Sequence, residues 1–322
     1  MSYVSRHSGQ KRILFVFIVL LTPQTLLFAQ QVADREFKPL AMEPRFESGA
    51  GPVVAIDQAH HNFHTAAGRY SAFAAVLRAD GYRVTVSNQR FAGEALAGVD
   101  LLVIANALAE ENEKKWSLPT PSAFEDEEID ALANWIEDGG RLLLIADHMP
   151  FPGAAGILGK RLGIDNWSNG FAGLGGEEAG NVKLGNLRFQ VDSGLVLKNL
   201  QLGKPFRENE IKWVESFTGS AFRTNQEWLP VMELPSTAKS LEPKQAWKFT
   251  TTEVAEVAGW HQGAVRKLGK GRIAAFGEAA MFTAQNSGSA RGFGLNSEAS
   301  PHNQDFLRQV VAWLVAGIPG KK

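Results

Sequence analysis

The sequence predicts an α/β fold built on a doubly wound, mainly parallel sheet. Short, continuously apolar runs at residues 53–57 and 101–105 are typical of strands that are buried on both faces. Amphipathic helical patterns alternate with these runs along the chain. Such alternation predicts βαβ units, and hence a parallel sheet covered by helices on both faces.

The first predicted unit spans residues 53–87. After the strand at 53–57, the apolar spacing from Tyr70 to Leu77 defines one face of a helix, and Gly81 stands where a helix ends. Residues 82–87 alternate in polarity and form the second predicted strand, and residues 101–106 form the third.

The next helix carries the clearest start signal in the chain. Ser122 and Glu125 are spaced as a capping box, and the acidic residues that follow favour the positive end of a helix dipole. Gly139 and Gly140 end this helix. A fourth strand is predicted over residues 141–148, which end in Asp147 and His148.

The pattern becomes glycine-rich and more β-like between about residues 167 and 260. This stretch is predicted to be a β-rich insertion, with candidate strands at 182–191, 211–217 and 228–234. Residues 263–277 then predict a hairpin, and residues 303–316 a final helix. We therefore expect one α/β domain over residues 52–318, preceded by an extended segment at 30–51.

Residues 1–29 have the features of a cleavable secretory signal peptide. Arg6, Lys11 and Arg12 precede an apolar run that Pro23 interrupts, and Ala29 offers a small residue for cleavage. The run is shorter than the roughly 20 residues that span a bilayer. The expected localisation is therefore periplasmic or secreted, with no stable membrane span after leader removal.

Composition narrows the possible functions further. The chain has no cysteine, which excludes disulfides, thiolate metal sites and cysteine nucleophiles. Its formal charge of −1 becomes more negative once the basic leader is removed. Without a basic run, the sequence gives no reason to expect nucleic acid as a partner.

Polar residues gather at the predicted strand ends, where ligands bind in open α/β sheets. Histidine with carboxylate suits acid/base chemistry, and the amides suit ligand binding. The candidate catalytic residues are Asp57, His60, His64, Asp147, His148 and Glu278. The candidate ligand-binding residues are Asn62, Asn106 and Asn303.

Three interpretations of this cluster stay open. Asp57, His60 and His64, spaced three and four residues apart, could bind a divalent metal, zinc or manganese, with Asp147 or His148 completing the site. A metal-free acid/base pair that includes Glu278 is the second. The third is structural: capping and hydrogen bonds to loop backbone.

Several sharper motifs are absent. The sequence has no nucleophile elbow, no phosphate-binding GK[ST] loop, no GxGxxG and no HExxH, so no nucleotide cofactor is expected. Tryptophans crowd the β-rich segment, where they could stack on sugars or pack in the core. These are Trp167, Trp213, Trp228, Trp247 and Trp260.

Five motifs resemble a family of exported bacterial proteins with no assigned reaction. Its domain is similar to the class-I glutamine-amidotransferase fold, a flavodoxin-like sheet shared with trehalose-utilisation type proteins. True amidotransferases use a cysteine nucleophile, which this chain lacks, so the resemblance implies the fold and not that chemistry. The motifs are Asp57-x-x-His60-x-Asn62-x-His64-Thr65, Leu102-Val103-Ile104-Ala105-Asn106, Gly139-Gly140-x-Leu142-Leu143-Leu144-Ile145-Ala146-Asp147-His148, Pro150-Phe151-Pro152-Gly153 and Gly277-Glu278-Ala279-Ala280-Met281-Phe282.

Two functions remain as expectations. The first is an exported hydrolase or lyase that acts on a small molecule or glycan through the His/Asp/Glu cluster. The second is a non-catalytic ligand-binding or accessory domain of the cell envelope. The clustered histidines favour the first, because binding alone seldom requires several titratable imidazoles together.

Overall fold

The computed structural model describes residues 31–92, 94–176, 181–191, 194–199, 211–287, 292–318 and 320. The predicted leader lies outside the described residues. Among the described helices, none is long and apolar enough to cross a membrane. The helices are α1 (Ser71–Ala79), α2 (Asp126–Glu137), α3 (Phe151–Arg161) and α4 (Asn303–Leu314).

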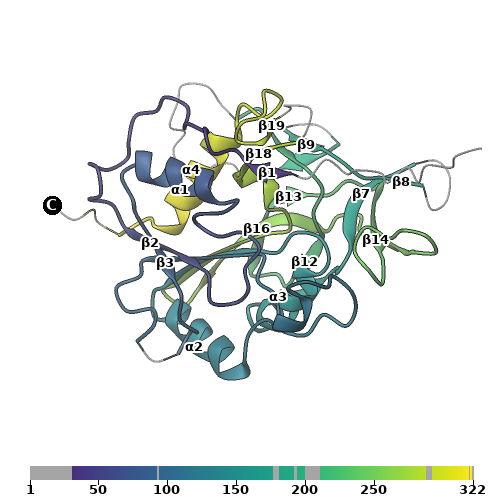
Figure 1. Cartoon of the computed structure of the whole chain (residues 1–322), viewed down its shortest axis with the longest axis horizontal. Coiled ribbons are helices and arrows are strands. Elements are labelled where there is room, and N and C mark those ends of the chain that lie inside the picture. Colours follow the sequence, from purple (N-terminus) through teal and green to yellow (C-terminus); the bar gives the residue numbers. More distant parts are fainter. Residues whose placement is uncertain are drawn as a thin grey trace, which may run out of the picture.

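Five strands form the parallel half of the main sheet (Figure 1), in the spatial order β3-β2-β4-β5-β17. Counted along the chain, this is the order 2-1-3-4-5, which is that of flavodoxin-like sheets. The strands are β2 (Val53–Asp57), β3 (Arg83–Ser87), β4 (Leu101–Ala105), β5 (Arg141–Ile145) and β17 (Gly271–Phe276).

The other half of the main sheet is mostly antiparallel. β16 (His261–Leu268) pairs with β17 as the predicted hairpin, from Gly263 opposite Phe276 to Leu268 opposite Gly271. Because this hairpin reverses the chain, the strands beyond it continue the sheet in mixed directions. They are β13 (Trp228–Glu233), β10 (Val196–Leu197), β9 (Leu187–Gln190) and β11 (Trp213–Ser216), with β12 (Phe222–Thr224) and β6 (Ile164–Trp167) pairing at the side.

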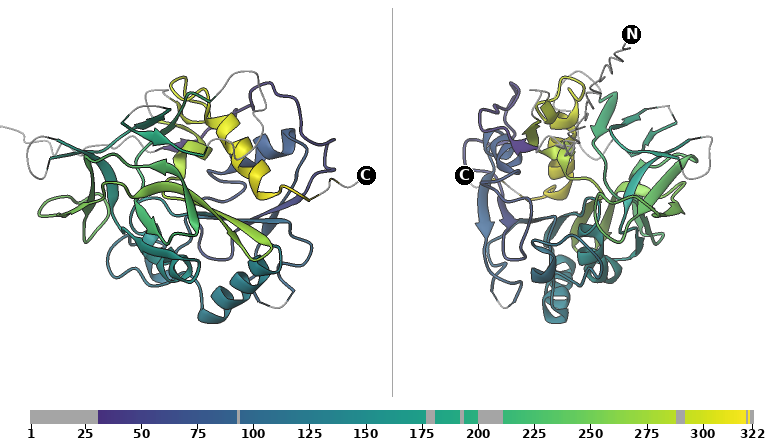
Figure 2. Two further views of the ribbon diagram at one scale, coloured as in Figure 1. Left: turned by 180° about the vertical axis from the view of Figure 1, so that it is seen from behind. Right: turned by 45° about the vertical axis from the view of Figure 1, so that its right-hand side comes forward.

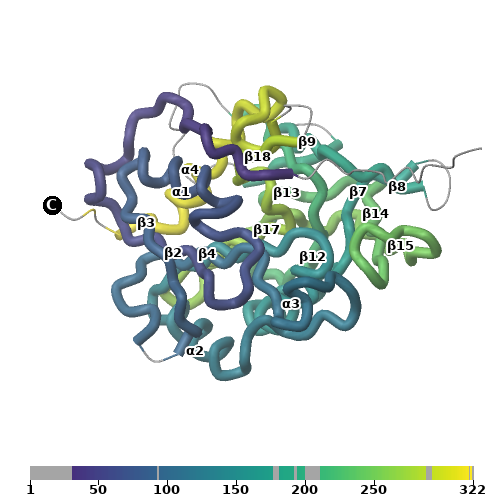
Figure 3. Tube along the Cα trace, in the orientation of Figure 1, coloured from purple at the N-terminus to yellow at the C-terminus, as the bar shows by residue number. Residues whose placement is uncertain are grey.

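The expected doubly wound, mainly parallel sheet therefore describes only half of the observed sheet. Much of the β-rich insertion adds strands to the same sheet. Part of it forms a separate four-stranded sheet that extends to one side (Figure 3), and a three-stranded sheet lies near the first described residues. The strands of these two sheets are β7 (Phe171–Gly175), β8 (Val182–Lys183), β14 (Ala238–Glu242), β15 (Glu253–Glu256), β1 (Val32–Ala33), β18 (Ala284–Asn286) and β19 (Gly292–Gly294).

Helices cover both faces of the parallel half. α1 and α4 lie on one face, and α2 and α3 lie on the other (Figures 1 and 2). The apolar strand residues alternate between two cores accordingly: Val103 packs with the α1 and α4 side chains, and Leu102 and Ile104 pack with those of α2 and α3. The continuous apolar runs in the sequence reflect this burial on both faces.

The segment at 31–51 is anchored along the domain. The Leu40 amide donates to the Gln304 side chain at 2.8 Å, and the Arg45 amide donates to Asp80 at 2.8 Å. Arg308 of α4 connects this segment to the domain, because it donates to the Glu43 carbonyl and forms a fully buried ion pair with Asp80.

Two local predictions about helices need correction. The capping box of α2 uses Glu125 and Glu128, not Ser122 and Glu125, whereas Ser122 accepts a hydrogen bond from the Phe124 amide. Helix α3 was not predicted, because its glycines lower its helix propensity. Proline at its start fits, because the first turn leaves its amides without intrahelical partners.

Candidate functional site

A cavity of about 630 Å³ lies at the carboxyl ends of the parallel strands. The rule for open α/β sheets predicts a ligand at this edge. The strand ends of β4, β5 and β17 each contribute polar side chains to it, and the loop after β2 adds His64. The polar and charged lining residues are Gln31, His64, Arg69, Asn106, Asp147, His148, Thr218, Glu278 and Gln285.

Asn106 fixes the orientation and tautomer of His64. The Asp147 amide donates to Oδ1 of Asn106 at 2.9 Å, so the amide group of Asn106 is left to donate through Nδ2 to Nδ1 of His64, also at 2.9 Å. His64 therefore carries its proton on Nε2. Burial lowers the pKa of His64 well below 6.5, and the charge of Arg69 adds to that shift, so the imidazole is neutral.

Backbone geometry places Asn106 where it can do this. It follows β4 with φ of 53°, a left-handed conformation that asparagine tolerates better than most residues. Its own amide donates to the Ile145 carbonyl, which continues the ladder with β5 by one residue. The sequence thus places an amide side chain across the ends of two neighbouring strands.

Asp147 and Glu278 bring two carboxyl groups to the same cavity. Asp147 is 7% exposed and Glu278 is fully buried. Burial raises the pKa of Asp147, and burial together with the charge of Asp147 raises the pKa of Glu278 well above its ordinary value. Two carboxyl groups in such an environment do not both ionise readily near neutral pH.

Glu278 is held by backbone amides at the start of a 3₁₀ helix, η3 (Ala280–Phe282). The Ala280 amide donates to Oε1 and the Met281 amide donates to Oε2, both at 2.8 Å. A hydrogen bond from the Phe217 amide also opposes the rise in its pKa. These amides fix the carboxyl group at the end of β17, while burial keeps its pKa high.

His148 forms part of an aromatic wall. Its Nδ1 donates to the Met149 carbonyl at 2.7 Å, and its ring stacks on Phe171 with centroids 4.5 Å apart. Trp247 packs edge-on against His148, with ring centroids 4.8 Å apart. The remaining aromatic lining residues are Phe63, Trp116, Phe151 and Phe217.

The five tryptophans of the predicted β-rich segment therefore have different roles. Trp247 lines the cavity and is 45% exposed, whereas Trp228 is buried in the core. Trp116, which lies outside that segment, is a second cavity tryptophan that sequence reasoning missed.

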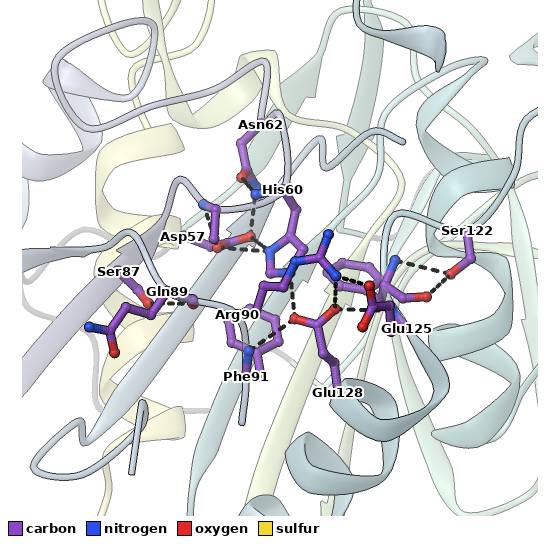
Figure 4. Close-up of polar contacts among 12 residues, drawn as sticks. Asp57, His60, Asn62, Ser87, Gln89, Arg90, Phe91, Ser122, Glu125 and Glu128 are labelled. Atoms are coloured by element: carbon purple, nitrogen blue, oxygen red, sulfur yellow. Dashed lines mark hydrogen bonds and ion pairs between the residues drawn. The ribbon is translucent and has the colours of Figure 1, made fainter. Parts of the chain in front are cut away.

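Asp57 and His60 belong to a separate, buried network (Figure 4). His60 contacts Asp57 through Nδ1 at 2.9 Å and Glu128 through Nε2 at 3.0 Å. Burial alone would lower the pKa of His60, but the two carboxylates outweigh it and raise the pKa. Burial would raise the pKa of Glu128, but the Glu125 amide and His60 lower it. The buried trio of Asp57, His60 and Glu128 is therefore a charged link between the end of β2 and the start of α2.

Neither Asn62 nor Asn303 is among the residues that line the cavity, and their ligand-binding role stays a prediction. Asn62 donates to Asp57 at 2.9 Å and accepts from the His60 amide, so it belongs to the buried network. Asn303 pairs with the backbone of Glu215 in both directions and anchors the start of α4 to β11. Asn106 is the one member of that predicted set among the lining residues.

The proposed metal ligands are divided between these two places. His60 binds both Asp57 and Glu128, whereas His64 and His148 line the cavity. Within the described part of the chain, no group of three or more histidine or carboxylate residues is arranged to hold a metal ion. The divalent metal thus stays a prediction.

Sequence reasoning missed the cavity residues that come from loops. Arg69 precedes α1, and Thr218 follows β11 with φ of 134°, a strained conformation for a β-branched residue. Next to it, Gly219 has φ of 114°, and a Cβ there would lie 2.4 Å from the Gly277 carbonyl. This glycine, next to a predicted strand, was the available signal for a close backbone approach.

No protein-family model and no curated protein matches the chain. Among solved structures, similarity is found to the mmIFT52 N-terminal domain, at TM-score 0.54 and 13% identity over 83% of this chain and 99% of that domain. A ThuA-like protein from Bacteroides uniformis has a TM-score of 0.45 and 12% identity, covering 86% and 94% of the two chains. PurLQS from Thermotoga maritima has a TM-score of 0.42 and 10% identity, covering 82% and 99%. At such an identity, the similarity to the mmIFT52 domain shows a shared α/β fold and gives no information about activity.

Proposed function

We propose that the protein is an exported hydrolase or lyase whose active site is the cavity at the ends of β4, β5 and β17. One observation carries the proposal: two buried carboxyl groups, Asp147 and Glu278, line the same cavity as the neutral His64. Groups with shifted pKa values in a concave site are the usual mark of acid/base chemistry.

The energetic cost of this arrangement supports a functional role. Burying a carboxylate without a cationic partner is costly, and two other carboxylates that are fully buried have such a partner. Asp80 meets Arg308, and Asp57 meets His60. Among the described residues, Asp147 and Glu278 have no such ion pair, so they carry a stability cost that acid/base function would explain.

The two carboxyl groups suit different roles in hydrolysis. Glu278 has the more strongly raised pKa and retains a proton to give to a leaving group. Asp147 is then the group that takes a proton from water as the water attacks the substrate. His64 presents Nε2–H and stabilises the negative charge that develops on the substrate.

The walls of the cavity support a small substrate that contains a ring. Trp116 and Trp247 provide flat apolar faces, and the volume of about 630 Å³ suits a ligand of one or two rings. Glycans and aromatic compounds both fit this description. We propose no nucleotide cofactor; a divalent metal, zinc or manganese, remains part of the proposal to be tested by elemental analysis of the purified protein.

A non-catalytic binding function is the second candidate. It is favoured by the way the polar groups are tied to the protein, since both oxygens of Glu278 accept backbone amides and Nδ1 of His64 is bound by Asn106. A site of that kind recognises a ligand without moving protons.

Activity screening with matched variants separates the two. A panel of chromogenic glycosides, esters and amides is tested with the wild-type protein, Asp147→Asn and His64→Ala, with Glu113→Gln as the control on the exposed surface. The enzyme proposal expects the two site variants to lose about 100-fold or more in kcat/KM, and the control to retain full activity. Binding of panel members without turnover, or equal turnover by all variants, contradicts it. Intact mass of the exported chain tests the leader.

A further inference from the structure

Arg69 is the one cationic side chain among the described lining residues whose charge is permanent. Its Nε donates to Oε1 of Gln285 at 3.2 Å, and its Nη2 donates to the Gln31 carbonyl at 2.9 Å. The guanidinium stacks over the ring of Phe63, with Cζ 4.2 Å from the ring centroid. Three contacts thus hold the head group at the cavity wall.

All of these partners are neutral. In the described chain, Arg69 forms no ion pair, and Nη1 has no hydrogen-bond partner, whereas Arg308, Arg266 and Arg90 each meet a carboxylate. Burial is sufficient to lower the pKa of Arg69. A partly desolvated arginine that lines a cavity and is oriented by neutral groups is arranged to receive an anion.

We propose that Arg69 binds a carboxylate group of the substrate, so that the cavity selects small carboxylic acids with a ring-sized body. This inference rests on the proposed function of the cavity and names its substrate class. Sugar acids and aromatic acids share the required chemistry: one carboxylate for Arg69 and one flat body for the aromatic walls.

Arg69 is linked to the proposed reacting groups by a chain of hydrogen bonds. Gln285 accepts from Arg69 and donates to Thr283 at 2.8 Å, and Thr283 donates to the carbonyl of Ala280, whose amide binds Glu278. A carboxylate on Arg69 is therefore held at a fixed position relative to Glu278. The anchoring group and the proposed reacting group thus line the same cavity.

The charges on the cavity wall favour a single carboxylate over a phosphate. A phosphate carries up to two negative charges and commonly meets several cations or a helix N-terminus. Here one arginine faces the cavity, and Asp147 and Glu278 add negative charge when ionised. A monocarboxylate balances Arg69 and leaves no excess charge to repel those groups.

The test compares the binding of acids with that of their neutral counterparts by isothermal titration calorimetry on the full-length mature protein. The two pairs are D-glucuronate with D-glucose, and phenylacetate with phenylacetamide. A charge-assisted hydrogen bond predicts that at least one acid binds about tenfold or more tightly than its neutral counterpart. The pair that shows the preference identifies the sugar or the aromatic source.

Variants assign the preference to Arg69. Arg69→Gln is expected to abolish it, and Arg69→Lys, which keeps the charge, is expected to retain part of it. Arg223→Gln is the matched control, because Arg223 also stacks on an aromatic ring, that of Trp260, away from the cavity. Thermal unfolding by circular dichroism confirms that each variant is folded.

Three outcomes would overturn the inference: equal binding of acid and neutral compound, a preference that survives in Arg69→Gln, or no binding of either acid at millimolar concentration. Because calorimetry needs no turnover, the result is independent of the catalytic proposal. If the wild-type protein binds acid and neutral compound equally while its turnover depends on Asp147, the carboxylate anchor alone is refuted. If the wild-type protein prefers the acid while turnover is unchanged in Asp147→Asn, the catalytic roles alone are refuted.

Discussion

The side-chain amide of Asn106 donates to Nδ1 of His64 at 2.9 Å, and this one hydrogen bond determines which nitrogen of the histidine carries the proton. The bond joins the end of β4 to the loop after β2, on either side of the point where the strand order of the parallel half reverses. In flavodoxin-like sheets this switch point is where ligands bind. The tautomer of His64 thus depends on β2 and β4 being neighbours in the sheet, which brings Asn106 next to His64.

Replacing this donor by an acceptor tests the relationship. In Asn106→Asp, a carboxylate faces Nδ1 of His64, and an opposite charge at hydrogen-bond distance is expected to raise the pKa of His64 by about one unit or more. Proton NMR titration of the His64 ring signals measures the change. An unaltered pKa, with the Asp147 amide still bound to residue 106, would show that Asn106 does not control the imidazole.

His60 and His64 are expected to respond in opposite ways to replacement by alanine. His60→Ala leaves Asp57 and Glu128 buried without their cation, which is expected to cost about 3–5 kcal/mol of unfolding free energy. His64→Ala removes a neutral ring at the edge of an existing cavity and should cost less while lowering activity. Chemical denaturation compares the two. Similar losses of stability would mean that His64 is also a structural residue.

The buried trio also predicts how stability depends on pH. The raised pKa of His60 contributes stability that is complete below its unfolded value of 6.5 and is lost as pH rises through the folded pKa. The lowered pKa of Glu128 contributes stability that is complete above 4.5 and is lost as pH falls through the folded pKa. The two contributions overlap between about pH 4.5 and 6.5.

The free-energy difference between wild-type protein and His60→Ala should therefore be largest in that window. Urea unfolding at a series of pH values measures it. A difference that stays constant from pH 4 to pH 9 would indicate that His60 is not charged in the folded protein.

Asp147→Asn is expected to stabilise the protein at alkaline pH while it removes activity. Because burial raises the pKa of Asp147, its favourable contribution exists at low pH and is lost as pH rises through the folded pKa. Asparagine avoids this loss, so the free energy of unfolding of the variant should exceed that of the wild-type protein by about 1 kcal/mol at pH 8 and should equal it near pH 4. Urea unfolding at the two pH values measures the difference. Asparagine can still accept the His148 amide, which keeps the local hydrogen bond. A variant that is less stable at pH 8 would instead identify Asp147 as a structural group.

The sequence predicts the strand ends better than it predicts their partners. Asn106, Asp147 and Glu278 each follow an apolar run, and the rule that parallel strands align their carboxyl ends is sufficient to bring them together. Arg69 and Gln285 reach the same cavity from loops that carry no periodic signal. Their proximity depends on packing between segments more than 200 residues apart, which local patterns do not encode.

The same limit explains why the sequence pattern grouped His60 with His64. Its spacing from Asp57 and His64 made the three look like one site, but its decisive partner is Glu128, 68 residues away. In the sequence, Glu128 is recognisable only as an acidic residue of the first helical turn. The mixed half of the sheet was underestimated for a related reason: its short strands alternate with glycine-rich turns, and pairing direction is set by the hairpin at residues 261–276.

The cavity tryptophans provide the last prediction. Trp247 is 45% exposed and packs on Phe171 and His148, so Trp247→Ala removes only part of the buried surface of a core tryptophan and should cost about 2 kcal/mol of stability. It also removes a stacking face, and binding of the preferred ring-bearing acid should weaken about tenfold. The control is Trp228→Ala, whose indole is buried and donates to the Leu162 carbonyl; it should lose about 3–5 kcal/mol of stability. Calorimetry and denaturant unfolding of both variants give the comparison. Unchanged ligand affinity in Trp247→Ala would show that this wall does not contact the bound ring.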